Sequence, residues 1–219
     1  MLSGTLLAVF DWFDQFDIQG FRSGRTNRST TTGTVGVTQI LTPTTLIDLN
    51  YGLTIQKGEL GNTWNVVPLA TNKLGPELLP TERVRHAFVA RVSQFLPWNG
   101  ALHLYYRHYR DDWGLVAHSI EGELLQRILP SLYVGAVYRF HTQTGVDFFT
   151  VLANPALLLR TADSDLAPLD AYTIGGKIVV DVPVRGEIRA LHFDLGYERY
   201  VRTNDLQISV LTWGTGYRF

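Results

Sequence analysis

Four side chains in the middle of the sequence are of the types that bind metal ions. They are His103, Glu121, Glu123 and His141, and imidazole and carboxylate groups are ligands for zinc and similar ions. Their spacing does not match a metal-binding motif, so packing among other polar groups is the preferred interpretation. We predict no metal site and no cofactor.

An acid/base pair is the second chemical candidate. His118 follows Asp111 and Asp112 closely in the sequence, and an imidazole beside a carboxylate can act as a general acid or base. A tight hairpin turn explains the two aspartates equally well. The Gly-x-Ser-x-Gly motif of serine hydrolases and all cysteines are absent, which removes the nucleophiles that those residues supply. We predict no enzyme activity and assign no catalytic residue.

Alternation of apolar and polar residues identifies the elements that position these side chains. In residues 45–56, every second residue from Ile47 to Ile55 is apolar, and those between are polar or glycine. This period of two is typical of a β-strand with two different faces. The pattern recurs towards the C-terminus, so we predict an all-β, antiparallel fold with one charged face.

The expected strands fill most of a single domain, residues 1–219. They lie near residues 30–41, 44–58, 81–96, 101–113, 115–129, 132–149, 171–184, 190–203 and 206–219. A further strand within residues 5–22 would make ten, with residues 1–29 forming that strand and a loop. Short turns are expected at residues 42–43, 97–100, 130–131 and 185–186, a tight connection at 111–114, and long loops at 59–80 and 150–168.

Composition and charge exclude several classes of protein. Charged residues make up 18% of the chain, against roughly a quarter in ordinary soluble domains. The net charge of -1 offers no basic stripe for nucleic acid, so we predict no nucleic-acid partner. No apolar run approaches the roughly 18 to 20 residues of a transmembrane helix. Residues 6–10 lack the preceding basic region of a signal peptide, which indicates a mature or truncated chain.

Two kinds of β-protein remain. A soluble sandwich or lipocalin-type barrel also alternates, but its polar residues face the water outside. Three features favour a membrane protein: segments longer than the usual strand of about 5 to 6 residues, tyrosines near strand ends on the apolar face, and polar faces rich in glycine and threonine. We predict an antiparallel up-and-down transmembrane β-barrel of about ten strands with a polar lumen.

The predicted lumen carries charges of both signs. Its charged members are Arg83, Arg85, Arg91, His103, Arg107, Glu121, Glu123, Arg127, Arg139, His141, Lys177, Asp194 and Glu198. Opposite charges on adjacent strands would form a cross-strand ladder, which satisfies groups that cannot face lipid. A structural ladder in a narrow lumen is preferred to a selectivity filter, and both interpretations remain open.

The last strand carries aromatic residues on one face. Trp213, Tyr217 and Phe219 are two or four residues apart, as in the aromatic girdle at a membrane interface. The terminal Tyr-Arg-Phe also resembles the C-terminal signature that bacterial outer-membrane proteins present to the barrel assembly machinery. We therefore expect that machinery to be a partner during insertion.

Two other segments suggest contacts. The loop at residues 59–80 is apolar for an exposed connection, so it would form a constriction, bind a protein partner or pack over the barrel mouth. Arg22, Arg25 and Arg28 lie among serines and threonines. They would contact lipopolysaccharide phosphates or belong to a solvated loop.

Several motifs resemble an uncharacterised bacterial outer-membrane barrel family, domain of unknown function 3570. They are TQILTPTT (38–45), LNY (49–51), GELGN (58–62), TERVRHA (81–87), LPWNGALHLYYR (96–107), DDWG (111–114), AHS (117–119) and LGYERY (195–200). The likeness is strongest over residues 34–126. It implies longer chains with a signal peptide and further strands, so the ten strands would be the C-terminal part of a larger barrel. No activity and no catalytic residues carry over.

Outer-membrane location and a small pore or transport role are the leading expectation. The first alternative is a plugged barrel that binds a partner through residues 59–80. The second alternative is a barrel enzyme that uses His118 with Asp111 or Asp112. A soluble ligand-binding barrel is a further class, and it would remain monomeric without detergent.

Overall fold

The described part of the chain folds mainly into strands. The computed structural model describes residues 1–16, 22–62, 64–183 and 190–218. The strands are β1 (Leu2–Phe16), β2 (Arg22–Thr42), β3 (Thr45–Gly58), β4 (Val66–Pro68), β5 (Leu74–Pro76), β6 (Glu82–Leu96), β7 (Gly100–Asp111), β8 (Val116–Leu129), β9 (Leu132–Gln143), β10 (Leu169–Pro183), β11 (Ala190–Arg202) and β12 (Gln207–Arg218). These residues contain no helix that is long and apolar enough to cross a membrane.

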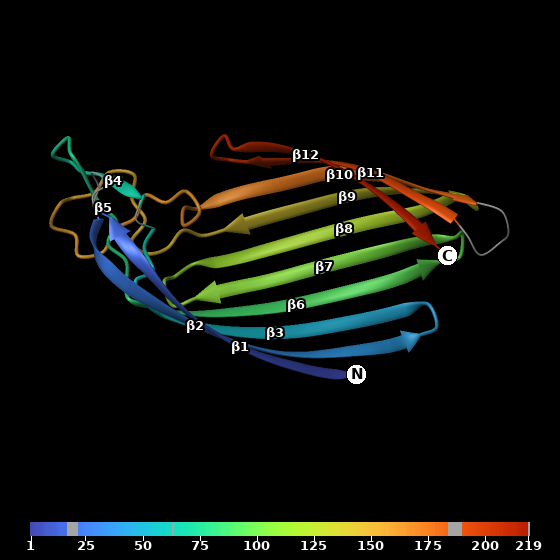
Figure 1. Ribbon diagram of the computed structural model, residues 1–219, viewed down its shortest axis with the longest axis horizontal. Helices are drawn as coiled ribbons and strands as arrows, with labels where there is room; N and C mark the ends of the chain where they lie inside the picture. Colours follow the sequence, from blue (N-terminus) through green and yellow to red (C-terminus); the bar gives the residue numbers. More distant parts are fainter. Residues whose placement is uncertain (17–21, 63, 184–189, 219) are drawn as a thin grey trace.

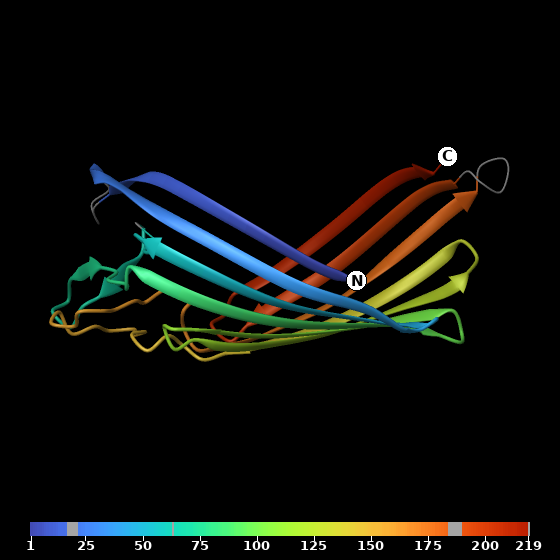
Figure 2. The same cartoon turned by 90° about the horizontal axis from the view of Figure 1, so that it is seen from below.

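Ten of the strands form one antiparallel sheet, in the order β1-β2-β3-β6-β7-β8-β9-β10-β11-β12. Strands β4 and β5 form a separate small hairpin. The large sheet is a single curved layer (Figures 1 and 2). One end, the turn end, holds the β2–β3, β6–β7 and β8–β9 turns, and both chain termini point towards it (Figure 1). The opposite end, the loop end, holds the long loops and the β7–β8 and β11–β12 turns (Figure 1).

The turns follow from local residue chemistry. Asn99 adopts a φ of 62° between β6 and β7, and asparagine tolerates this left-handed conformation better than most residues. Gly114 has a φ of 86° between β7 and β8. A Cβ atom there would lie 2.2 Å from Oδ1 of Asp147, so only glycine fits this turn.

The predicted antiparallel all-β fold is confirmed, with two corrections. Residues 1–29 form β1 and the start of β2 rather than a strand and a loop, because pairing with β1 keeps the polar residues 24–29 extended. The strand predicted at 132–149 ends at Gln143. The apolar residues after it, Val146, Phe148 and Phe149, pack with Trp113 instead of continuing the strand.

The sheet does not close into the predicted ring. In the described residues, β1 and β12 each pair on one side only, and no Cα atom of one lies within 8 Å of a Cα atom of the other. Closure depends on strand number, tilt and stagger together. Alternation of residue types does not encode these quantities, which is why it predicted strands but not the open edges.

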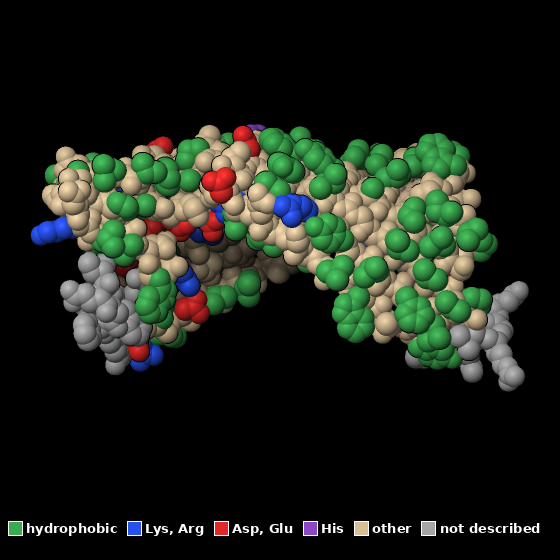
Figure 3. Space-filling view, turned by 90° about the horizontal axis from the view of Figure 1, so that it is seen from above, with side chains coloured by type: hydrophobic (Ala, Val, Ile, Leu, Met, Phe, Trp, Pro, Cys, Tyr) green, Lys and Arg blue, Asp and Glu red, His purple; other side chains and the backbone are tan. Residues whose placement is uncertain are grey.

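The two faces of the sheet differ in polarity. Leu49, Ile120 and Leu195, on one side, are 41%, 56% and 52% exposed. The other side carries ion pairs such as Arg91–Asp48 and Arg139–Glu121, whose arginines are half-exposed and whose carboxylates are 20% and 24% exposed. We call the apolar side the outer face and the polar side the inner face. Figure 3 shows hydrophobic side chains spread over the half of the molecule away from the loops, with charges gathered towards the loop end.

Buried hydrophobic side chains gather at the loop end. They are Val67, Trp113, Leu115, Ala117, Val146, Ala153, Ala167, Leu169 and Ala171. Trp113 meets Phe148 edge to face with ring centroids 5.4 Å apart. The core therefore joins the loops to the strand ends, and it does not cover the apolar face of the sheet.

Candidate functional site

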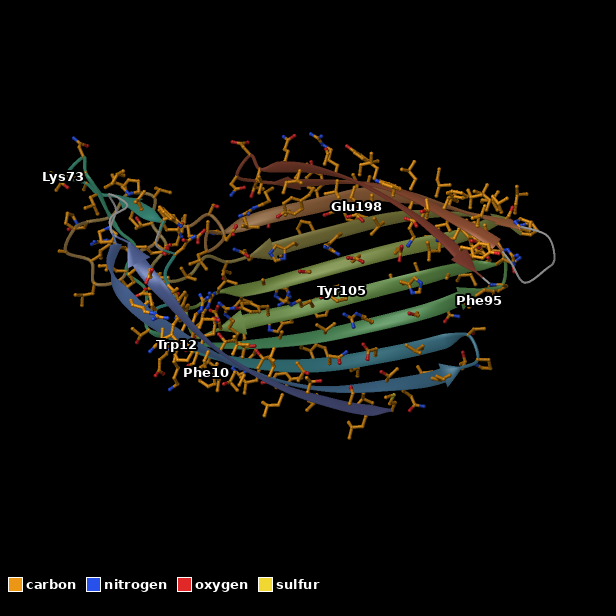
Figure 4. The ribbon with its side chains drawn as sticks, in the orientation of Figure 1. Phe10, Trp12, Lys73, Phe95, Tyr105 and Glu198 are labelled. Atoms are coloured by element: carbon orange, nitrogen blue, oxygen red, sulfur yellow. The ribbon has the colours of Figure 1, made fainter. Side chains whose placement is uncertain are left out.

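The pairing register places every predicted lumen charge on the inner face. Successive residues of a strand point to opposite sides, and the pairs Asp48↔Arg91, Tyr105↔Glu121 and Lys177↔Gly196 fix the parity of the neighbouring strands. The residues brought together are Arg83, Arg85, Arg91, His103, Arg107, Glu121, Glu123, Arg127, Arg139, His141, Lys177, Asp194 and Glu198. Figure 4 shows Tyr105 and Glu198 within the curve of the sheet.

One row of charges crosses the middle of the inner face. In order from β3 to β9 it contains Asp48, Arg91, Tyr105, Glu121 and Arg139. Arg91 donates to Asp48 at 3.2 Å and lies 5.4 Å from the centre of the Tyr105 ring. Arg139 Nε donates to Glu121 at 2.5 Å. The charged members of this row form a cross-strand ladder in which the sign alternates.

A second ion pair spans a strand that carries no charge of its own at that point. Lys177 on β10 reaches Glu123 on β8 at 2.5 Å, and Gly135 of β9 is the register partner of Lys177. A Cβ atom at Gly135 would lie 2.8 Å from Cδ2 of Leu125 and 3.0 Å from Cγ of Lys177. The missing side chain therefore leaves the space through which Lys177 crosses.

Gly135→Ala is expected to destabilise the protein by about 1 kcal/mol, because the added methyl group displaces Lys177. Gly122→Ala is the control, since its Cβ would meet only Leu104, at 3.7 Å. Urea unfolding midpoints of the two variants in detergent measure the difference. Equal midpoints would show that Lys177 can reach Glu123 even when residue 135 carries a side chain.

Further inner-face residues complete these contacts, and alternation in the sequence already places Asp48, Asn50, Asp181 and His192 on the polar face. His192 lies 2.7 Å from Asp181 and 3.6 Å from Asp194. Asp48 accepts hydrogen bonds from Thr38 and Asn50 besides Arg91. Their alternation with apolar neighbours carried the signal, because the same parity that selected Glu121 places them on the inner face.

The loop end of the inner face holds a buried ion pair. Arg83 Nε donates to Asp111 at 2.8 Å, and their side chains are 8% and 0% exposed. Asp111 also accepts hydrogen bonds from Tyr109 Oη and from the backbone N–H groups of Trp113 and Leu115. The carboxylate thus anchors the β7–β8 turn rather than facing an open site.

The acid/base pair suggested by the sequence is not assembled. His118 lies on the outer face, where its Nδ1 is 2.8 Å from Tyr106 Oη and its ring is 4.8 Å from that of His108. Asp111 lies on the inner face, and Asp112 accepts from the Val84 backbone N–H. The sheet backbone therefore separates His118 from Asp111.

The four candidate metal ligands are already bonded to other side chains. His103 and His141 are hydrogen-bonded to Ser93 and Ser119, and Glu121 and Glu123 are occupied by Arg139 and Lys177. Within the described residues, no group of three or more histidine, aspartate or glutamate side chains could hold a metal ion.

The long loops pack on each other at the loop end. Leu69 pairs with Ala153 and Leu78 with Arg160, while the Thr161 hydroxyl donates to Glu77. Residues 59–80 therefore pack against residues 144–168, and Trp64 remains 72% exposed. This packing at the loop end fits one of the expectations for residues 59–80, that they pack rather than extend into solvent.

The remaining predicted contacts lie towards the edges of the sheet. Trp213 and Tyr217 are 75% and 50% exposed on the outer face, and Phe219 lies outside the described residues. Arg25 and Arg28 belong to β2 rather than to a loop. Arg28 lies 3.8 Å from Asp11 and over the Phe13 ring, so it packs within the sheet.

Comparison with known families gives one match. The model of the family described as "Protein of unknown function (DUF3570)" matches residues 7–212. The chain belongs to this family. The DUF3570 match begins in β1 and ends in β12, so it contains the strands from β2 to β11 whole and parts of the two edge strands. No significant match was found among curated proteins.

Proposed function

We propose that this chain forms the wall of a β-barrel in the bacterial outer membrane and acts as a small pore or transport component. The observation that carries the proposal is the uncovered apolar outer face. A soluble sheet buries its apolar side against a second layer. Here that side is exposed over the single layer (Figure 2), and its Ile120, Ile174 and Trp213 are 56%, 58% and 75% exposed.

The ends of the outer face support a position across a bilayer. Between the middle of the strands and the loop end, Tyr51 Oη bonds to His86 Nδ1 at 2.7 Å and Tyr106 Oη to His118 Nδ1 at 2.8 Å. At the turn end, Trp98 is 61% exposed. Amphipathic rings at both limits of an apolar band are typical of membrane interfaces. The strands of the large sheet span 12 to 21 residues, more than the roughly 9 to 11 that a crossing needs.

A barrel requires the edges of β1 and β12 to be covered, because an unpaired backbone edge is not tolerated in lipid. We propose that further strands complete the ring, so that this sheet is part of a larger barrel. The partners implied are outer-membrane lipid, lipopolysaccharide and, during insertion, the barrel assembly machinery. The inner face then lines a lumen with charges of both signs.

The protein should fractionate with the outer membrane when it is expressed with a signal peptide, and its gel mobility should change on boiling. Both are expected because a closed barrel resists detergent until it is heated. A soluble protein with unchanged mobility would contradict the membrane assignment. Planar bilayers then test the pore: discrete conductance steps support it, whereas a folded barrel without conductance would favour the plugged, partner-binding alternative.

A further inference from the structure

A hollow near the loop end of the inner face is lined by arginines from two neighbouring strands. It measures about 240 Å³, and Arg83 and Arg85 of β6 and Arg107 of β7 contribute to its wall, with Tyr109 between them. Arg107 also lines the adjoining hollow of about 370 Å³ towards the middle of the sheet. Positive groups therefore follow one track along the inner face.

Two of these arginines form no ion pair with any carboxylate in the described part of the chain. Among the described residues, no carboxylate oxygen lies within 4.0 Å of a nitrogen of Arg85 or Arg107. The Nε of Arg85 is also buried with no hydrogen-bond partner. A buried donor without an acceptor is costly, so a ligand oxygen that accepts from this N–H group would be favourable.

The surrounding carboxylates do not compensate these charges. Asp111 is occupied by Arg83, and Asp165, which lines the same hollow, accepts from Arg202 at 2.8 Å. The pairs Arg83–Asp111 and Arg202–Asp165 each sum to zero. Arg85 and Arg107 therefore leave the hollow with two uncompensated positive charges.

The neutral side chains around the hollow already have hydrogen-bond partners. Tyr109 Oη donates to Asp111, Ser119 Oγ lies 2.9 Å from His141 Nδ1, and Gln143 Nε2 donates to backbone carbonyls of Asp165 and Ala167. Recognition is therefore left to the two guanidinium groups. Their planar N–H forks suit carboxylate or phosphate oxygens in a bidentate arrangement.

We propose that Arg85 and Arg107 form a binding site for a small oxyanion with two negative charges, of the inorganic phosphate type. The site lies on the inner face, away from the apolar face that would meet lipid, so the ligand is a soluble anion rather than a lipid headgroup. This inference rests on the proposed function, because it gives the lumen a preference for such anions.

Calorimetric titration of the full chain, folded in detergent, with inorganic phosphate tests the site. Arg107→Gln, at an exposed position, is expected to weaken phosphate binding about tenfold or more, and Arg85→Lys to weaken it because the fork is lost. Arg110→Gln is the matched control. It lies on β7 three residues from Arg107 and removes the same charge, but it belongs to the outer face, so its affinity should equal that of the unaltered protein.

Absence of phosphate binding by the folded protein would overturn the site, as would equal losses in Arg107→Gln and Arg110→Gln. Folding is checked on each sample by the mobility change on boiling. If the protein shows this mobility change but does not bind phosphate, the anion site is rejected and the barrel is retained. If the protein is soluble without detergent and its mobility is unchanged, the barrel is rejected, whatever the phosphate affinity.

Discussion

Asp111→Ala is expected to lower the free energy of unfolding by about 3 to 5 kcal/mol, because it leaves Arg83 as a buried charge without a partner. The Arg83 guanidinium lies 4.2 Å from the Trp113 ring centre and is 8% exposed, so water cannot replace the lost carboxylate. The Trp113 and Leu115 N–H groups also lose their acceptor. Urea unfolding in detergent, followed by tryptophan fluorescence, measures the change.

Glu82→Ala provides the control for Asp111. Glu82 bonds to Lys57 at 2.9 Å at the same end of the sheet, but both side chains are more than half exposed. Exposed pairs contribute roughly 0 to 1 kcal/mol, so this variant should unfold like the unaltered protein. Similar losses in both variants would mean that solvent reaches Asp111 and that the buried network does not anchor the β7–β8 turn.

Ile178→Arg is expected to prevent insertion into lipid vesicles or to destabilise the inserted protein by about 2 to 4 kcal/mol, the cost of arginine near the bilayer midplane. Ile178 is 48% exposed and has Val134 and Leu195 as its register partners. In a soluble protein, arginine at so exposed a position would change stability by only about 0.5 kcal/mol. Folding yield in vesicles, read by gel mobility, distinguishes the two cases.

Gln39→Arg is the matched control for Ile178. Gln39 also belongs to the outer face, opposite Ile47, but it lies near the turn end, where arginine costs only about 0 to 1 kcal/mol. If the outer face meets lipid, Ile178→Arg should lose much of its folding yield in vesicles and Gln39→Arg only a little. Equal folding yields would indicate that the outer face meets water.

The assignment of residues to faces could be predicted because it depends on local parity. Glu121, Arg139 and Lys177 were placed on one face from alternation alone, and the register puts them there. Alternation does not predict the residue at which a strand ends. The strand predicted to reach residue 149 stops at Gln143, since the apolar residues beyond it find a core with Trp113 that no period of two describes.

Contacts between strands were harder to predict, because they depend on register and on side-chain reach. Lys177 bonds to Glu123 two strands away only because Gly135 leaves room. His118 is close to Asp111 along the chain, yet the pairing Tyr109↔Ala117 puts the two side chains on opposite faces. Short separation across a hairpin therefore does not imply proximity unless the register of the turn is known.

The open edges of the sheet constrain the shape that any complete ring can have. In a ten-stranded antiparallel sheet, the first and last strands run in opposite directions, and β1 leaves the turn end while β12 returns to it (Figure 1). The edges can meet directly or through an even number of added antiparallel strands, whereas an odd number would force a parallel pair. A ring built on this sheet without parallel pairs therefore has an even strand total, whether the added strands come from the same chain or from a second copy.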